Sequence, residues 1–202
     1  MKDADLEFLN RNECFLCKKL SEYEFSYMAG LQRYLGFPEN ESAETVIQDG
    51  GFCNYHSYTL LKLSNKHHLA GFLIPLANDY INHRISLPDQ WQVDCPVCHT
   101  LDETAQEYLN QFVNQYTVNE AFHTSFLDSA FLCLPHLQKV LKTNLTAEEK
   151  RELLKHEKDC LFQLLDELSR LKNTTYHKAG KNEKYAPIRV IKVLVGRYGT
   201  IH

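Results

Sequence analysis

Apolar side chains recur at intervals of three and four residues through most of the chain. This spacing places them on one face of a helix and predicts a series of amphipathic helices. Before the C-terminal segment there is no alternating strand pattern, hairpin turn or strand–helix–strand order, so we predict an all-α fold. The predicted helices cover residues 18–34, 43–48, 53–64, 67–85, 102–124, 133–142 and 146–172.

Local signals refine this pattern at several helix ends. Thr146 and Glu149 form a capping-box sequence, which predicts the start of the longest helix. Pro75 lies inside the fourth predicted helix and is expected to kink or divide it. Residues 173–184 are polar and rich in lysine, which indicates a linker. Residues 187–195 suit a strand or a helix; we favour a helix that has Pro187 in its first turn.

A cysteine motif occurs twice along the chain. Each copy has a Cys-x-x-Cys pair followed, about 35 residues later, by a Cys-x-x-His pair. An internal repeat of this kind predicts a duplicated helical repeat. The residues are Cys14, Cys17, Cys53 and His56 in the first copy and Cys95, Cys98, Cys133 and His136 in the second.

The repeat suggests how the chain is divided. We expect residues 1–86 to form the first helical repeat and residues 87–145 the second. Residues 146–202 would add a long helix and a basic tail, all within one compact globular unit.

Three thiols and one imidazole are the ligand set of a tetrahedral zinc site. Ligands three residues apart at the start of a helix share a face, so each pair can chelate one ion. We predict that each half is pinned by its own Cys3His site, which joins the beginning of one helix to the beginning of a later one. The expected cofactor is therefore zinc, with two ions per chain.

Other chemistries stay open at these positions. An iron–sulfur cluster accepts similar ligands, and a ligand list alone does not separate it from zinc. Four protein ligands leave no open position on zinc, which indicates structural sites and argues against an enzyme. No catalytic residue is predicted, although a pocket that brought Glu22, Glu103 or His99 to an open coordination position would change that interpretation.

Two acidic residues match between the copies. Glu22 and Glu103 each lie eight residues after the first cysteine of their copy. They are candidates to orient the ligand histidines through hydrogen bonds. They could equally be exposed carboxylates near a helix N-terminus, where the helix dipole favours negative charge.

Composition and termini limit the class of protein. The chain of 202 residues is 44% hydrophobic and 24% charged, as in an ordinary globular protein. It lacks an apolar run long enough to span a membrane and a secretory signal, so we expect a cytoplasmic protein. In a reducing compartment the seven cysteines would be thiols or metal ligands.

Positive charge is concentrated at the C-terminus. Residues 173–202 carry a net charge of +5, whereas the first 172 residues carry −9. This tail either binds an acidic ligand or protein partner, or docks on the acidic body of its own chain. Aromatic and basic residues are not interleaved in it, which argues against nucleic acid.

The paired motifs also carry a resemblance. Cys-x-x-Cys with a glutamate five residues on, Gly51-Phe52-Cys53-x-x-His56 and the second such set resemble a family of uncharacterised, mostly bacterial proteins of unknown function. The resemblance covers about residues 10–142 and includes residues 188–196, and it departs from the family pattern at Leu132, where a Phe is expected. It implies no activity.

Two functions from different classes follow. The first is a zinc-stabilised helical module that binds a protein partner or a ligand. The second is a redox or sensor protein whose Cys3His sites hold iron–sulfur clusters or release zinc on oxidation. Because four protein ligands would leave no open position on the zinc ion, we favour the zinc-stabilised module.

Overall fold

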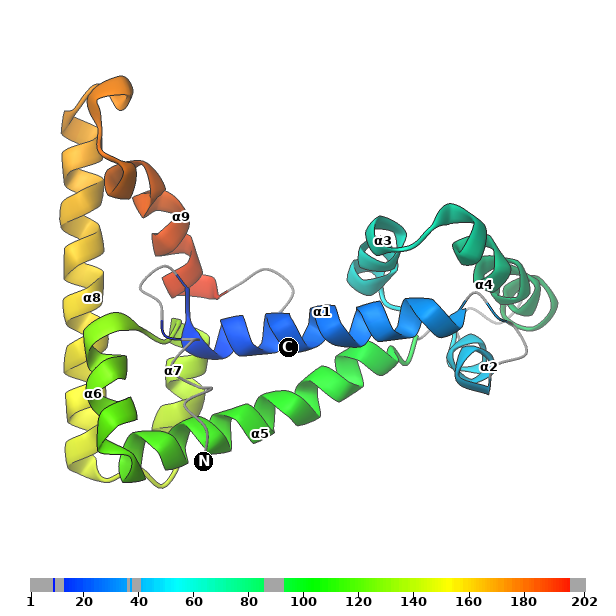
Figure 1. The fold of residues 1–202 in the computed structure, drawn as a ribbon, viewed down its shortest axis with the longest axis horizontal. Helices are drawn as coiled ribbons and strands as arrows, with labels where there is room; N and C mark the ends of the chain where they lie inside the picture. The colour runs from blue at the N-terminus through cyan, green and yellow to red at the C-terminus, as the bar shows by residue number, and fades with distance from the viewer. Residues whose placement is uncertain (1–8, 10–12, 36, 38–40, 86–92, 197–202) are drawn as a thin grey trace. The chain divides into compact units, whose positions relative to one another are not determined.

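The structure is a computed structural model that describes residues 9, 13–35, 37, 41–85 and 93–196. Within these ranges the regular secondary structure is helical and no strand occurs, which confirms the predicted all-α fold (Figure 1). The α-helices are α1 (Phe15–Leu35), α2 (Glu41–Gln48), α3 (Asn54–Leu63), α4 (Lys66–Asp79), α5 (Pro96–Val118), α6 (Glu120–Ser129), α7 (Leu134–Leu141), α8 (Ala147–Asn173) and α9 (Lys181–Val195).

The chain forms two compact units. Among the described residues, unit 1 contains residues 9, 13–21 and 105–196, and unit 2 contains residues 22–35, 37, 41–85 and 93–104. The boundaries fall within α1 and within α5, so each of these helices contributes residues to both units. The predicted division at residues 86 and 145, and the repeat behind it, stay predictions, because contacts in space define the units and not similarity along the chain.

Aromatic rings fill the core of unit 1. Phe15, in the first turn of α1, has its ring centroid 5.7 Å from that of Phe112 on α5 and 5.5 Å from that of Phe122 on α6. Phe126 packs edge-on against Phe112 at 5.1 Å, and its side chain is fully buried. These contacts fix the start of α1 against α5 and α6, next to the first Cys-x-x-Cys pair.

The longest helix, α8, begins as the sequence predicts. The Thr146 hydroxyl accepts a hydrogen bond from the Glu149 N–H, and the Glu149 carboxylate accepts one from the Thr146 N–H. This capping box satisfies donors that a helix N-terminus otherwise leaves unpaired. Helix α9 packs against α8 and α7 within unit 1 (Figure 1).

The C-terminal helix is confirmed, but its start is not where we predicted it. Helix α9 begins at Lys181, inside the stretch predicted to be a linker, and Pro187 lies within it and not in its first turn. The Glu183 carboxylate accepts a hydrogen bond from the Gly180 N–H at 2.5 Å, and this cap starts the helix before the proline. A capping interaction thus outweighed the proline signal.

A similar correction applies to the predicted helix over residues 102–124. The structure starts α5 earlier, at Pro96, and ends it at Val118. The Asn119 side chain accepts a hydrogen bond from the Phe122 N–H at 3.1 Å and begins α6. An N-cap inside an apolar pattern divides one predicted helix into two.

The core of unit 2 is built from α1–α5 and the loop before α3. Phe52 and Phe72 are buried with ring centroids 5.8 Å apart. Pro75 lies inside α4 without dividing it, and α4 continues into a π-helical turn, η2 (Tyr80–Arg84). The predicted link between the repeats, residues 86–89, falls outside the described residues. Among those that are described, no helix combines the length and apolarity needed to cross a membrane.

Candidate metal centres

The eight predicted ligands come together in two clusters. One, here called site 1, contains Cys14, Cys17, Cys133 and His136, and the other, site 2, contains Cys53, His56, Cys95 and Cys98. In each cluster the ligand atoms lie within 4.8 Å of one another. Each arrangement could hold a metal ion.

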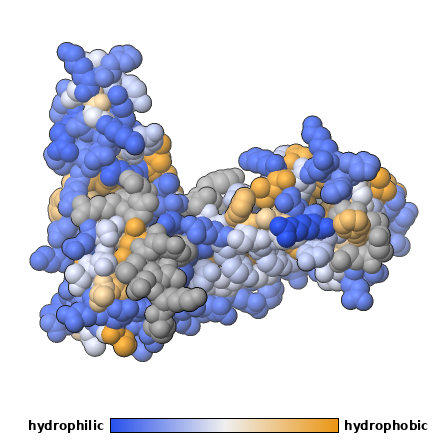
Figure 2. Space-filling view, viewed as in Figure 1, coloured by the Kyte–Doolittle hydropathy of each residue, from blue (hydrophilic) through white to orange (hydrophobic). Residues whose placement is uncertain are grey.

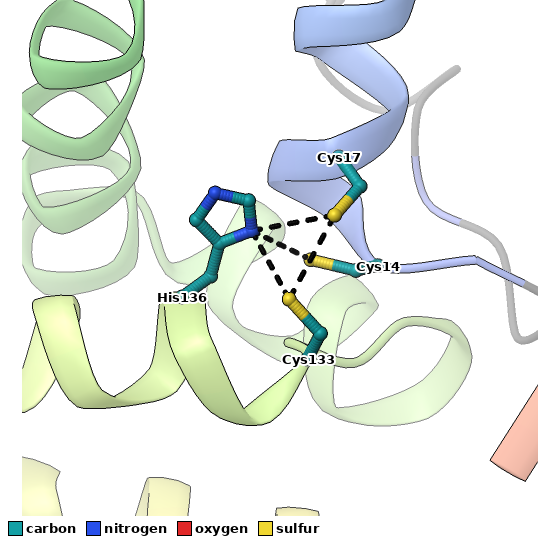
Figure 3. Close-up of side chains that lie close together, drawn as sticks. All are labelled: Cys14, Cys17, Cys133 and His136. Atoms are coloured by element: carbon teal, nitrogen blue, oxygen red, sulfur yellow. Dashed lines mark hydrogen bonds between the residues drawn. The ribbon is translucent and has the colours of Figure 1, made fainter. Parts of the chain in front are cut away.

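Site 1 lies in unit 1 and all four of its side chains are buried. His136 Nδ1 is 3.4 Å from the sulfurs of Cys14 and Cys17 and 3.2 Å from that of Cys133. The sulfurs of Cys17 and Cys133 are 3.7 Å apart. The three thiols and the imidazole therefore point at one common centre (Figure 3).

Site 2 lies in unit 2 and has nearly the same geometry. His56 Nδ1 is 3.2 Å from Cys53 Sγ and 3.4 Å from the sulfurs of Cys95 and Cys98. The Cys53 and Cys98 sulfurs are 3.7 Å apart. Site 2 differs in its exposure, since Cys53 and Cys98 are only partly buried.

Every ligand pair lies at a helix N-terminus. Cys133 is the N-cap of α7 and Cys53 is the N-cap of α3, so the histidine three residues on falls in the first turn. The two Cys-x-x-Cys pairs stand at the starts of α1 and α5. The unpaired N–H groups and the dipole of a helix N-terminus favour a thiolate there. Each site joins the starts of two helices, α1 with α7 and α3 with α5.

The structure corrects the predicted pairing of the motifs. Each site takes its Cys-x-x-Cys pair from one half of the sequence and its Cys-x-x-His pair from the other, so neither half is pinned by its own four ligands. The length of α1 gives the physical reason. Its 21 residues carry the chain about 30 Å away from Cys17. The eight-residue α2 does not retrace that length, and Cys53 meets the second Cys-x-x-Cys pair instead.

A buried carboxylate that the sequence did not single out lies beside site 2. Glu24 Oε1 is 3.5 Å from His56 Nε2, the nitrogen opposite the one that faces the sulfurs. Both side chains are buried, which makes Glu24 a group that can orient the imidazole. The repeat could not reveal it, because Ala105 stands at the corresponding position of the second half.

The two predicted carboxylates lie elsewhere. Glu22 and Glu103 are both exposed. Glu103 Oε1 is 3.6 Å from His99 Nδ1, and the two form an exposed pair one helical turn apart. Their exposure agrees with the second of the two interpretations, but each is the eighth residue of its helix and so lies beyond the first turn, where the dipole acts.

The pKa values of the clustered thiols show that neighbouring thiolates oppose one another's ionisation. In site 1, burial raises the pKa of the Cys14 thiol well above its ordinary value, whereas hydrogen bonds from Cys133 and Cys14 lower the pKa of Cys17. In site 2, burial and the neighbouring thiolate of Cys95 raise the pKa of Cys98. Three thiolates cannot coexist in such surroundings without a positive charge at their centre.

The pKa of His56 points the same way. Burial alone would lower it, but hydrogen bonds with Cys95 and Glu24 raise it to about 10. Without a metal ion, a proton on the His56 imidazole would thus supply positive charge beside the thiolates of site 2. A metal ion would displace that proton and bind Nδ1 directly.

A second unpredicted carboxylate supports the ligand loop of site 1. Glu157 on α8 is buried, and its Oε1 accepts a hydrogen bond from the Leu132 N–H at 2.6 Å. Burial raises the pKa of this carboxyl to about 8, against the lowering effect of that hydrogen bond. Glu157 lies four residues from both Leu153 and Leu161, within the predicted leucine stripe, and a carboxylate at such a position is the sequence signal that could have identified it.

Comparison with known proteins identifies the family but no activity. Residues 75–185, more than half of the chain, match the Family of unknown function (DUF6062), and the chain belongs to this family. No curated protein and no solved structure gives a significant match. The expected resemblance over residues 10–142 thus overlaps the matched region only in part.

The matched region contains one half of each site. It includes the Cys-x-x-Cys pair of site 2 and the Cys-x-x-His pair of site 1. The complementary halves, Cys14 with Cys17 and Cys53 with His56, lie before it. Because the pairing crosses the two halves, neither site is complete within the matched residues.

The pairing can be tested by the reactivity of the remaining thiols. In the Cys133→Ser variant we expect Cys14 and Cys17 to lose their shared ion and become reactive toward an alkylating reagent, while Cys95 and Cys98 stay protected. The reciprocal variant, Cys53→Ser, should expose Cys95 and Cys98 and leave site 1 protected. Mass spectrometry of the alkylated native protein reads out each thiol. Reactive Cys95 and Cys98 in Cys133→Ser, with Cys14 and Cys17 protected, would restore the pairing within each half.

The role of Glu24 can be separated from that of Glu22 by matched substitutions two residues apart. We expect Glu24→Ala to weaken metal binding at site 2 by about 10- to 100-fold, because the ligand imidazole loses the group that orients it. Glu22→Ala should have no such effect. Competition with a chromophoric chelator measures both affinities, and site 1 in the same molecule serves as the reference. Equal affinities in the two variants would remove Glu24 from the metal site.

Proposed function

We propose that the protein is a zinc-stabilised helical scaffold that binds a partner, with one structural zinc ion in each of its two units. The observation that carries this proposal is the convergence of three sulfurs and one imidazole nitrogen at each site.

The distances favour zinc. In a tetrahedral site with Zn–S bonds of ~2.3 Å and Zn–N bonds of ~2.0 Å, the sulfurs lie ~3.8 Å apart and sulfur lies ~3.5 Å from nitrogen. In the structure the sulfurs of Cys17 and Cys133, and those of Cys53 and Cys98, are 3.7 Å apart, and sulfur lies 3.2–3.4 Å from nitrogen. Thiolate and imidazole ligands bind zinc in preference to magnesium or calcium.

The ligand number favours a structural role. Zinc bound by three cysteines and one histidine has no open position for substrate or water. Site 1 is also enclosed, since all of its ligands are buried. The ion would hold helix starts together, and binding of zinc to sites of this kind is worth on the order of 10 kcal/mol in small peptides. That energy is comparable with the whole stability of a domain.

A surface for a partner is present on α9. Tyr185, Ile188, Ile191, Leu194 and Val195 are each about half exposed or more, and Figure 2 shows hydrophobic residues at the surface over this helix. Exposed apolar patches of this kind are typical of interaction surfaces.

Basic side chains accompany these apolar residues. Lys181, Lys184 and Lys192 each lie four residues from Tyr185 or Ile188 and so share their side of the helix. Two other contacts bind the tail to its own chain, Arg189 with Glu167 and Lys192 with Glu13. These ion pairs support docking on the acidic body, and the exposed remainder supports a partner with acidic and apolar groups.

A redox or sensor function is the second candidate, and one observation favours it. Cys53 and Cys98 of site 2 are partly exposed, whereas every ligand of site 1 is buried. Solvent can therefore reach two thiolates of site 2, and access is a condition for oxidation or metal exchange. Iron–sulfur clusters would also be compatible with the ligand set.

Metal content separates the two candidates. Protein purified without oxygen and without a metal-affinity tag should contain about two zinc ions per chain and be colourless. Cys17→Ala should lose one of them, and Cys160→Ala should lose neither, because Cys160 lies outside both clusters. Elemental analysis with a visible spectrum gives the answer. Iron with sulfide and a brown colour would contradict structural zinc and establish the second candidate.

A further inference from the structure

An apolar groove lies between α3 and α4 in unit 2. Its volume is about 360 Å³. Phe52, Leu60, Leu69 and Phe72 form its floor and are buried, whereas Tyr58, Leu61 and Leu73 form its rim and are about half exposed. Figure 2 shows hydrophobic residues at the surface over these helices.

Two of the hydroxyl groups that line the groove donate hydrogen bonds to backbone carbonyls. The Ser57 hydroxyl donates to the Phe52 carbonyl at 3.0 Å, and the Tyr80 hydroxyl donates to the Gly50 carbonyl at 3.1 Å. Among the described residues that line the groove, none is charged. A ligand bound there would therefore gain apolar contact and little hydrogen bonding, which selects against charged and strongly polar molecules.

The backbone around the groove departs from regular helix at two places. Gly50 has a φ of +85°, a conformation in which other residues are strained, and its carbonyl accepts a hydrogen bond from the Tyr80 hydroxyl. Tyr80 begins the π-helical turn at the end of α4. Turns of this kind are rare and frequently occur at functional sites. Here Tyr80, the first residue of the turn, lines the groove together with Gly50.

From these observations we propose that the groove binds a small, uncharged apolar molecule, aliphatic or aromatic. Its volume lies at the lower end of the ~300–1,000 Å³ range of small-molecule sites, and its lining of aromatic and aliphatic side chains is typical of them. The same volume accommodates only a few side chains of a protein partner. The half-exposed rim leaves an entrance between Leu61 and Leu73.

The groove depends on the proposed zinc site in one respect. Cys53 of site 2 is the N-cap of α3, and Phe52 next to it belongs to the floor. Loss of the ion from site 2 would free the start of α3 and disturb the floor. Ligand binding in the groove thus goes beyond the proposed structural role of zinc, and it would depend on the metal ion at site 2.

The test uses the uncharged fluorescent probe N-phenyl-1-naphthylamine with the full-length, metal-loaded protein. We expect the probe to bind with enhanced fluorescence to the wild type. Leu73→Arg, which places a charge at the rim, should weaken binding about tenfold or more. Ile74→Arg is the matched control, because Ile74 is the next residue on α4, is also exposed and does not line the groove. It should bind like the wild type.

A second rim variant controls for a folding defect in Leu73→Arg. Leu61→Arg changes the other wall, on α3, and should lose the probe as Leu73→Arg does, with unchanged circular dichroism and metal content. No probe binding to the wild type, or equal binding in Leu73→Arg and Ile74→Arg, would overturn the proposal. So would a change from dimer to monomer in the rim variants without probe binding, because a second copy would then cover the groove.

Metal analysis of the same samples distinguishes failure of the structural-zinc proposal from failure of the groove proposal. If zinc is absent but the probe still distinguishes Leu73→Arg from Ile74→Arg, the structural-zinc proposal fails and the groove stands. If zinc is present in about two equivalents and the probe does not distinguish them, the groove fails and the zinc sites stand.

Discussion

The ionisation of thiols that face one another in two clusters is the main physical constraint on the structure. Each of its two units contains three cysteines and one histidine whose ligand atoms face one point, and in site 1 all four side chains are buried. Without a cation the thiols oppose one another's ionisation, as the raised pKa values of Cys14 and Cys98 show. Under the proposed function, a divalent ion at each site would neutralise the thiolates and would join two helix starts.

Because of the crossed pairing, an ion bound at either site would be a long-range link. The contact between Cys17 and Cys133 spans 116 positions of the sequence, and that between Cys53 and Cys98 spans 45. The entropic cost of closing a loop rises only slowly with its length, so a strong ligand set can close even the longer one. Because both links join opposite halves of the sequence, loss of either ion would affect residues from both halves.

Much of this arrangement could be predicted from the sequence, and the failures have physical causes. Helical periodicity, the Thr146 capping box and the spacing of the ligand pairs are local properties of the sequence. The structure confirms the helical fold, the cap and the clustering of the eight ligand residues that they predicted. The choice of partner pair depends on where α1 and α5 end in space, which the ligand spacing does not encode. Glu24 and Glu157 are buried, and each has an apolar residue four positions away on both sides, a spacing that places it on the buried face of its helix. The sequence therefore carried a signal for their burial, but none for the group that each carboxylate contacts.

The most direct test of the crossed pairing is NMR of the protein loaded with ¹¹³Cd, which reports which cysteines and histidine are coupled to each ion. The structure predicts two cadmium resonances. One should correlate with Cys14, Cys17, Cys133 and His136, and the other with Cys53, His56, Cys95 and Cys98. A resonance that correlates with Cys14, Cys17, Cys53 and His56 together would contradict the account, because each half of the sequence would then hold its own ion.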